Sequence, residues 1–211
     1  MNTFLKGTLL TAALLIGFGV STPVFAQEKG DVKGAEEGKK EAPAEGKKIE
    51  LPWKLEDMKK SVKKGGFSKL KMVMNMPAMG MSETSYQRME YTAVDDKGYT
   101  TKTTKYDAEN KETESEEETK TWEDFAKEFT DEMGMTEENT TVSDAKVKVA
   151  AGEFDCKVYT MKKTDENMGG MEMTMKIYLV KDKPGAIAKM EMSVPDFMDM
   201  TMELVEWSAG S

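Results

Sequence analysis

The sequence predicts an α+β domain in which a curved antiparallel β-sheet of about eight strands, a half-barrel, carries two short helices packed on or over its concave face. From Phe67 onward, apolar and polar residues alternate with the two-residue period of a strand. Turn signals such as Asp95–Gly98 and Lys183–Gly185 separate these segments. Only two stretches have helical spacing instead. A sheet of this size tends to curl around whatever it covers.

Residues 1–26 are typical of a cleavable secretory signal peptide. Lys6 supplies a positive charge ahead of a nearly uninterrupted apolar run over residues 7–20, which is too short to span a bilayer. Small residues before Gln27 suit a signal peptidase. Because no cysteine stands at the end of the apolar run, where a lipobox would need one, we expect no lipid attachment. We therefore expect a periplasmic or secreted protein with no stable membrane insertion after cleavage.

The remaining chain divides into a leader and one domain. Residues 27–50 are rich in Glu, Lys, Gly and Ala with almost nothing to bury, which predicts a disordered leader. Residues 51–211 contain the alternating and helical segments and are long enough for a single half-barrel domain with its own core.

Two helices are expected. The first covers Lys54–Lys64 and has three apolar side chains on one side. The second begins at Thr121, which caps the helix together with Asp124 in a capping box. Its apolar stripe, most simply explained by core packing, consists of Trp122, Phe125, Phe129 and Met133.

Alternation sets the expected strands. The charged segment Asp107–Lys120 predicts a solvated connection between the strand at 99–106 and the second helix. The expected strands cover residues 67–76, 86–94, 99–106, 142–149, 154–163, 171–181, 186–194 and 198–207.

Composition excludes several function classes. The full chain has a net charge of −9, and removing residues 1–26 removes one lysine and no acid. Such an acidic protein is a poor partner for nucleic acid. The chain has no histidine, which removes Ser-His-Asp and Cys-His catalysis and every histidine-ligated zinc or copper site. We therefore expect a non-enzymatic protein without a cofactor.

Methionine is unusually frequent, with 20 residues, and its placement is ordered. Methionines recur at every second position in four expected strands, so each set points to one face of the sheet. We expect this face to line a ligand cavity. The residues expected to line it are Met72, Met74, Met76, Met171, Met173, Met175, Met190, Met192, Met200 and Met202.

Three interpretations of this face remain open. Methionine is a flexible gap-filler, so the face can be an ordinary filled core with function elsewhere. The same flexibility suits an adaptable cavity for a hydrophobic small molecule, a lipid or a lipidated partner. Thioethers also suit Cu(I), for which the segment with Met171, Met173 and Met175 is the candidate site. Its spacing resembles the methionine motifs of periplasmic copper-handling proteins.

Cys156, the only cysteine, lies in an apolar alternation with Phe154 and Val158. Neither a histidine nor a second cysteine is present to activate or resolve it. This favours a buried, inert thiol over a redox or copper-binding one.

The C-terminal third also resembles a known family. Lys146–Lys157 (KVKVAAGEFDCK), Lys176–Glu191 (KIYLVKDKPGAIAKME) and Met202–Trp207 (MELVEW) follow a pattern of exported bacterial proteins: a strand and Gly-Phe turn, a Cys strand, an aromatic strand, a Pro-Gly hairpin and a closing strand. These proteins are similar to the lipoprotein-carrier-like (LolA-like) group. The resemblance implies a curved antiparallel half-barrel closed by helices over an apolar cavity.

Overall fold

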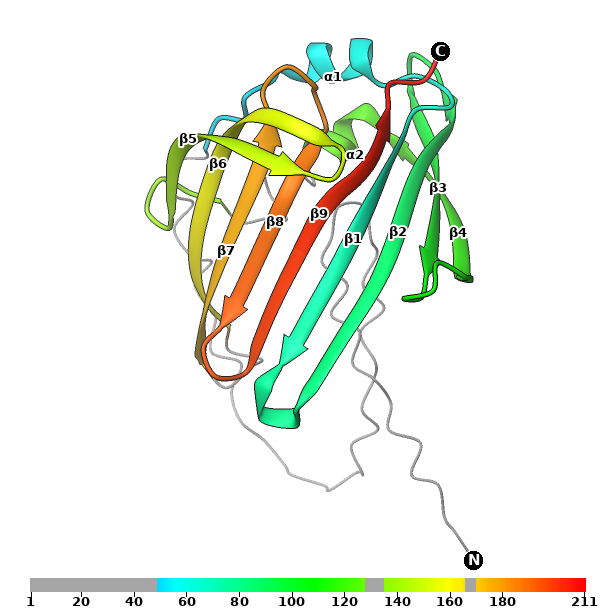
Figure 1. The fold of residues 1–211 in the computed structure, drawn as a ribbon. Helices are drawn as coiled ribbons and strands as arrows, with labels where there is room; N and C mark the ends of the chain where they lie inside the picture. The colour runs from blue at the N-terminus through cyan, green and yellow to red at the C-terminus, as the bar shows by residue number, and fades with distance from the viewer. Residues whose placement is uncertain (1–48, 128–134, 166–169) are drawn as a thin grey trace, which may run out of the picture. The chain divides into compact units, whose positions relative to one another are not determined.

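The computed structural model describes residues 49–127, 135–165 and 170–211. Within them the chain forms one open antiparallel sheet of nine strands in the order β4-β3-β2-β1-β9-β8-β7-β6-β5. Figure 1 shows the sheet curling along this order. The strands are β1 Phe67–Met76, β2 Met81–Val94, β3 Gly98–Tyr106, β4 Glu112–Thr121, β5 Thr140–Val149, β6 Gly152–Asp165, β7 Met171–Val180, β8 Ile187–Val194 and β9 Met198–Ser208.

The predicted sheet is confirmed as curved and antiparallel, but the predicted strand count of eight is wrong. The ninth strand is β4, which lies in the segment expected to be a solvated connection. Opposite side chains stabilise its pairing with β3: the Lys105 Nζ lies 2.9 Å from the Glu114 Oε2, and the Thr100 and Thr119 hydroxyls lie 2.9 Å apart. At the sheet edge both faces meet water, so a charged strand needs no apolar alternation.

The predicted turn between β2 and β3 is present. The Asp95 carboxylate accepts hydrogen bonds from the backbone N–H groups of Lys97 and Gly98, at 2.7 and 2.9 Å. These two hydrogen bonds lower the pKa of Asp95 below its ordinary value. A Cβ at Gly98 would collide with the carbonyl oxygen of Lys120 on β4. Only glycine therefore lets β4 approach this turn closely.

Helix α1 (Leu55–Ser61) lies at one end of the sheet, at the top in Figure 1. Its Met58 is buried and packs beside Gly185 in the β7–β8 loop: a Cβ built at Gly185 would lie 3.6 Å from the Met58 methyl group. Just before the helix, the indole N–H of Trp53 donates to the Val180 carbonyl at 2.8 Å. This bond ties the helix to the end of β7.

Helix α2 (Trp122–Lys127) packs on a face of the sheet. Trp122 and Phe125 contact the ring of Tyr99 on β3, with centroids 5.2 and 5.5 Å apart. The Trp122 indole N–H donates to the Asp95 carbonyl at 2.9 Å. The predicted stripe is thus present as far as Phe125, whereas Phe129 and Met133 lie outside the described residues, as do residues 1–48.

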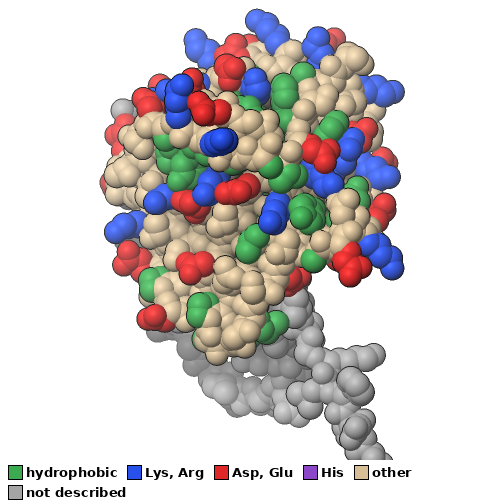
Figure 2. Space-filling view, viewed as in Figure 1, with side chains coloured by type: hydrophobic (Ala, Val, Ile, Leu, Met, Phe, Trp, Pro, Cys, Tyr) green, Lys and Arg blue, Asp and Glu red, His purple; other side chains and the backbone are tan. Residues whose placement is uncertain are grey.

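The opposite face of the sheet is charged. Figure 2, in the same view as Figure 1, shows Lys, Arg, Asp and Glu side chains interspersed over the visible surface. One ordered group centres on Lys189, whose Nζ lies 3.0 Å from Glu191 and 3.3 Å from Glu203. Tyr178 donates its hydroxyl hydrogen to Glu191 at 2.9 Å. In the part of the chain that is described, no helix is long and apolar enough to cross a membrane.

Candidate functional site

Strand register joins the methionines into two parallel rows. The first row crosses five strands, and each member lies directly opposite the next: Met74, Met200, Met192, Met175 and Met161. The second row, two residues along each strand, consists of Met72, Met202, Met190, Ile177 and Tyr159. We call these ten residues the methionine face. Directly opposite residues have Cβ atoms about 4.5–5.5 Å apart, so neighbouring thioethers are within reach of one another.

Seven of the ten predicted site methionines belong to the methionine face; the other three lie on the same side of the sheet by alternation, but beyond the two rows. Met76 lies opposite Met81 at the end of β1. Met171 and Met173 lie at the start of β7, opposite Asp165 and Lys163. The candidate copper segment is therefore split, because only Met175 joins a row. Ligand binding by these residues stays a prediction.

Sequence reasoning missed three members of the methionine face. Met161, Tyr159 and Ile177 occupy the register positions that complete the two rows on β6 and β7. The available signal was alternation within β6, where Tyr159 and Met161 are two residues apart. A row, however, depends on which strands are neighbours in the sheet. The pattern within a single strand does not reveal this.

The methionine face is packed. All members except Met72 are buried, and Met200 is only 2% exposed. By contrast, Met79 in the short 3₁₀ turn Pro77–Met79 is 57% exposed. The side chains thus fill the space beside the sheet. A ligand would have to displace them, which unbranched side chains with three rotatable bonds allow.

The same face becomes polar beyond β1. Ser85 and Glu83 on β2 lie opposite Met72 and Met74, so the rows end there. Farther along, Met89 lies opposite Thr103, and Thr103 lies opposite Glu116. Apolar packing on this half is concentrated where helix α2 meets the sheet. Tyr99, which contacts the helix, lies two residues before Thr101 and four before Thr103 on β3. These three side chains therefore point to one face, which is the face of the methionine rows.

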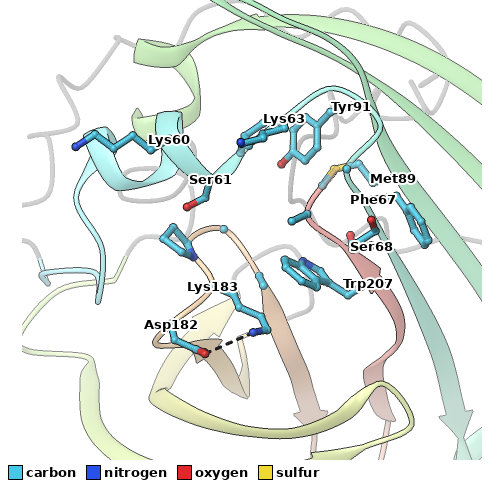
Figure 3. A pocket seen from close by; sticks show the side chains of 17 residues that line it. Lys60, Ser61, Lys63, Phe67, Ser68, Met89, Tyr91, Asp182, Lys183 and Trp207 are labelled. Carbon is cyan, nitrogen blue, oxygen red and sulfur yellow. Dashed lines mark hydrogen bonds and ion pairs between the residues drawn. The ribbon is translucent and has the colours of Figure 1, made fainter. Parts of the chain in front are cut away.

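A cavity of about 270 Å³ lies away from the methionine face, at the end of the sheet near α1. Figure 3 shows it between the end of α1, the start of β1, the β7–β8 loop and the C-terminal segment. None of the ten predicted site methionines lines it; the methionine on its wall is Met89. Sequence periodicity could not have found this cavity, because five separate segments form it.

Cys156 is fully buried, as predicted, in a cluster that includes Val147, Val180, Ala186 and Leu204. Burial, with a smaller contribution from the charge of Asp155, raises the pKa of the thiol to about 11. The thiol is therefore protonated and shielded at neutral pH. Among the described residues, no three acidic or thiol side chains gather as metal ligands would.

No family model matches this sequence, and no curated protein does. Several solved structures are similar to it, among them the following three. A protein described as exported, with a YmcC-like fold, from Bacteroides fragilis is 12% identical with a TM-score of 0.42, over 70% of this chain and 97% of that one. A protein described as a lipoprotein, from Parabacteroides distasonis, is 8% identical with a TM-score of 0.44, over 69% and 96%. A domain described as an outer-membrane lipoprotein-sorting protein, from Vibrio parahaemolyticus, is 11% identical with a TM-score of 0.26, over 72% and 89%.

Proposed function

We propose that this chain is an exported, non-enzymatic protein that binds a hydrophobic ligand, a lipid or a lipidated partner, on the methionine face. The observation that supports this proposal is the pair of contiguous rows across five strands. An ordinary core needs apolar volume, which leucine or valine supplies with less side-chain entropy to lose. Rows of methionine instead provide a surface that can re-pack around ligands of different shape.

Ligand entry would exchange contacts between methionines for contacts with the ligand. Directly opposite pairs such as Met192 and Met200 could separate by rotation of their side chains, without any change in strand pairing. The charged side chains of the opposite face would stay in water. Binding is therefore expected to leave the sheet register intact.

Native mass spectrometry of the protein purified from the exported fraction tests the proposal. We expect a co-purified mass of lipid size that organic extraction removes. A fluorescence titration with the neutral apolar probe N-phenyl-1-naphthylamine gives a second readout. The double variant Met192→Leu and Met200→Leu keeps apolar volume but loses flexibility, so we expect several-fold weaker binding of the probe. The matched control, Met79→Leu and Met81→Leu, changes two exposed methionines.

An equal loss of probe binding in both double variants, or no binding of lipid or probe, would contradict the proposal. The face would then be a filled core, and the protein's function would lie elsewhere.

A second candidate function is Cu(I) binding by thioethers. It is favoured by the cross-strand sequence Met175, Met192 and Met200, in which each sulfur-bearing side chain lies opposite the next. Cu(I) accepts such soft ligands. Native mass spectrometry under reducing conditions would then detect one copper adduct. Replacing these three methionines by Leu should abolish the copper adduct, whereas replacing Met171 and Met173 alone should not. If only the second replacement abolished the adduct, the copper site would lie at the start of β7 instead.

A further inference from the structure

We infer that the cavity between α1, the β7–β8 loop and the C-terminal segment is a second binding site, for a small organic anion that joins an apolar body to a carboxylate, phosphate or sulfonate group. The inference does not depend on the methionine face, because the two sets of residues are different. It rests on the walls of the cavity, on its charge and on one polar group that faces it.

The walls offer apolar and aromatic surface. Trp207 is 38% exposed, the largest exposure among the aromatic side chains that line the cavity. Trp53 and Trp122, in contrast, are buried and donate to backbone carbonyls. Met89 and Pro184 contribute further apolar surface to the lining. A flat or branched apolar group would find contacts on several sides.

The lining is positively charged although the whole chain is acidic. It includes Lys60, Lys63 and Lys183 but only one acid, Asp182. Lys183 is held in place: its Nζ lies 5.1 Å from the Trp207 ring centroid and 3.4 Å from Asp182. A fixed ammonium group beside an indole suits a ligand whose anionic group adjoins an apolar body.

One polar group adds a hydrogen-bond donor. Figure 3 shows the Tyr91 hydroxyl directed toward the cavity. Burial raises the pKa of Tyr91 to about 12, so the phenol keeps its proton. The ring is oriented by an edge contact with Tyr99, with centroids 5.5 Å apart. A neutral phenol next to lysines can donate to a carboxylate or phosphate oxygen.

The backbone around the cavity is well connected. Gly65 donates to the Tyr91 carbonyl at 2.8 Å, and Tyr91 donates to the Gly66 carbonyl at 2.9 Å. The C-terminal segment packs so closely that a Cβ at Gly66 would lie 3.0 Å from the Ala209 carbonyl oxygen. The cavity is thus pre-formed, which limits the entropy lost when a ligand binds.

The experiment compares two fluorescent probes on the purified full protein. 8-Anilinonaphthalene-1-sulfonate carries the anionic group, and N-phenyl-1-naphthylamine has the same rings without it. We expect the sulfonate to quench the emission of Trp207, identified by its loss in Trp207→Phe, and to bind more weakly as salt increases. The neutral probe should not quench Trp207.

Three substitutions locate the site. Lys63→Glu reverses a charge in the lining, and we expect about tenfold weaker binding of the sulfonate. Lys64→Glu makes the same change one residue away, outside the lining, and should leave binding within about twofold. Tyr91→Phe removes only the hydroxyl, and about two- to tenfold weaker binding is expected.

Equal effects of Lys63→Glu and Lys64→Glu, or equal quenching of Trp207 by both probes, would overturn the inference. If the sulfonate binds as described while the neutral probe does not bind at all, the proposal for the methionine face fails and this one stands. If only the neutral probe binds, the inference about the cavity fails and the proposal for the methionine face stands. The two proposals are thus tested separately.

Discussion

One face of a single sheet contains two regions that are built differently. On β1 and β9 to β6, the methionine face is continuous and packed, and its members lie opposite one another across the strands. On β2 to β4, the same face carries Ser, Thr, Lys and Glu, and the contacts made by helix α2 provide its apolar packing. Both regions are antiparallel sheet, and both contain register shifts between paired strands.

The difference shows that strand pairing and core formation are separate contributions to this fold. Backbone hydrogen bonds and opposite charges are enough to extend a sheet that is already nucleated. Free energy of folding, however, comes mainly from burial of apolar surface. We therefore expect the two regions to respond differently to substitution.

The largest expected effect is at Tyr99, which joins the polar region to helix α2. Its ring contacts Tyr91, Trp122 and Phe125, with centroid separations of 5.2 to 5.5 Å. Tyr99→Ala should lower the free energy of unfolding by about 3–5 kcal/mol. Hydrogen exchange should accelerate most in β3 and β4. Equal acceleration in β7 to β9 would mean that the two regions unfold as one unit.

A somewhat smaller effect is expected in the methionine face. Met200→Ala leaves a cavity in the middle of the first row and should cost about 2–5 kcal/mol of unfolding free energy. The control is Met79→Ala at an exposed position, where a change within about 0.5 kcal/mol is expected. Urea denaturation measures both. Similar losses in the two variants would show that the rows are not the core of this region.

The charged face opposite the rows should govern part of the acid stability. Desolvation alone would raise the pKa of Glu191, but hydrogen bonds from Lys189 and Tyr178, together with lysine charges, lower it below its ordinary value. A carboxylate with a lowered pKa stabilises the fold above its unfolded pKa, and that stability is lost as pH falls through the folded pKa.

Glu191→Gln should therefore flatten the fall in stability between about pH 5 and pH 3. Tyr178→Phe, which removes one of the hydrogen bonds to Glu191, should give an intermediate slope. The measurement is the free energy of unfolding in urea at several pH values. An unchanged slope in both variants would show that the group on this face does not contribute to acid stability.

The smallest expected effect is at the edge of the polar region. Lys105→Glu places like charges directly opposite each other, against Glu114 of β4, and should cost about 0.2–1 kcal/mol. Combining it with Glu114→Lys restores opposite charges and should recover most of the loss. Failure of the double variant to recover would mean that side chains across this edge do not stabilise the pairing of β4.

Most of the elements were predictable from local patterns. Alternation predicted the eight expected strands to within a few residues, and helical spacing predicted α1 and the start of α2. It failed at β4, because an edge strand exposed on both faces has no apolar side to reveal it. It also underestimated β2, whose first residues, Met81 to Ser85, extend the hairpin with β1.

The candidate sites were less predictable. Alternation predicted that the methionines of each strand share a face, because the side-chain period of a strand is two. It could not predict which of them meet, so Met171 and Met173 were grouped with the others although Asp165 and Lys163 are their neighbours. No local pattern in the sequence indicated the cavity near α1, because five separate segments line it.

By itself the sequence determined the class of fold, the alternation of each strand, the buried thiol of Cys156 and the absence of histidine chemistry, since these depend on residues close in the chain or on composition. Only the tertiary structure decided the order of the strands, the two rows and the cavity near α1. The physical reason is that β1 pairs with β9, so residues more than 120 positions apart become neighbours. Such contacts leave no local pattern.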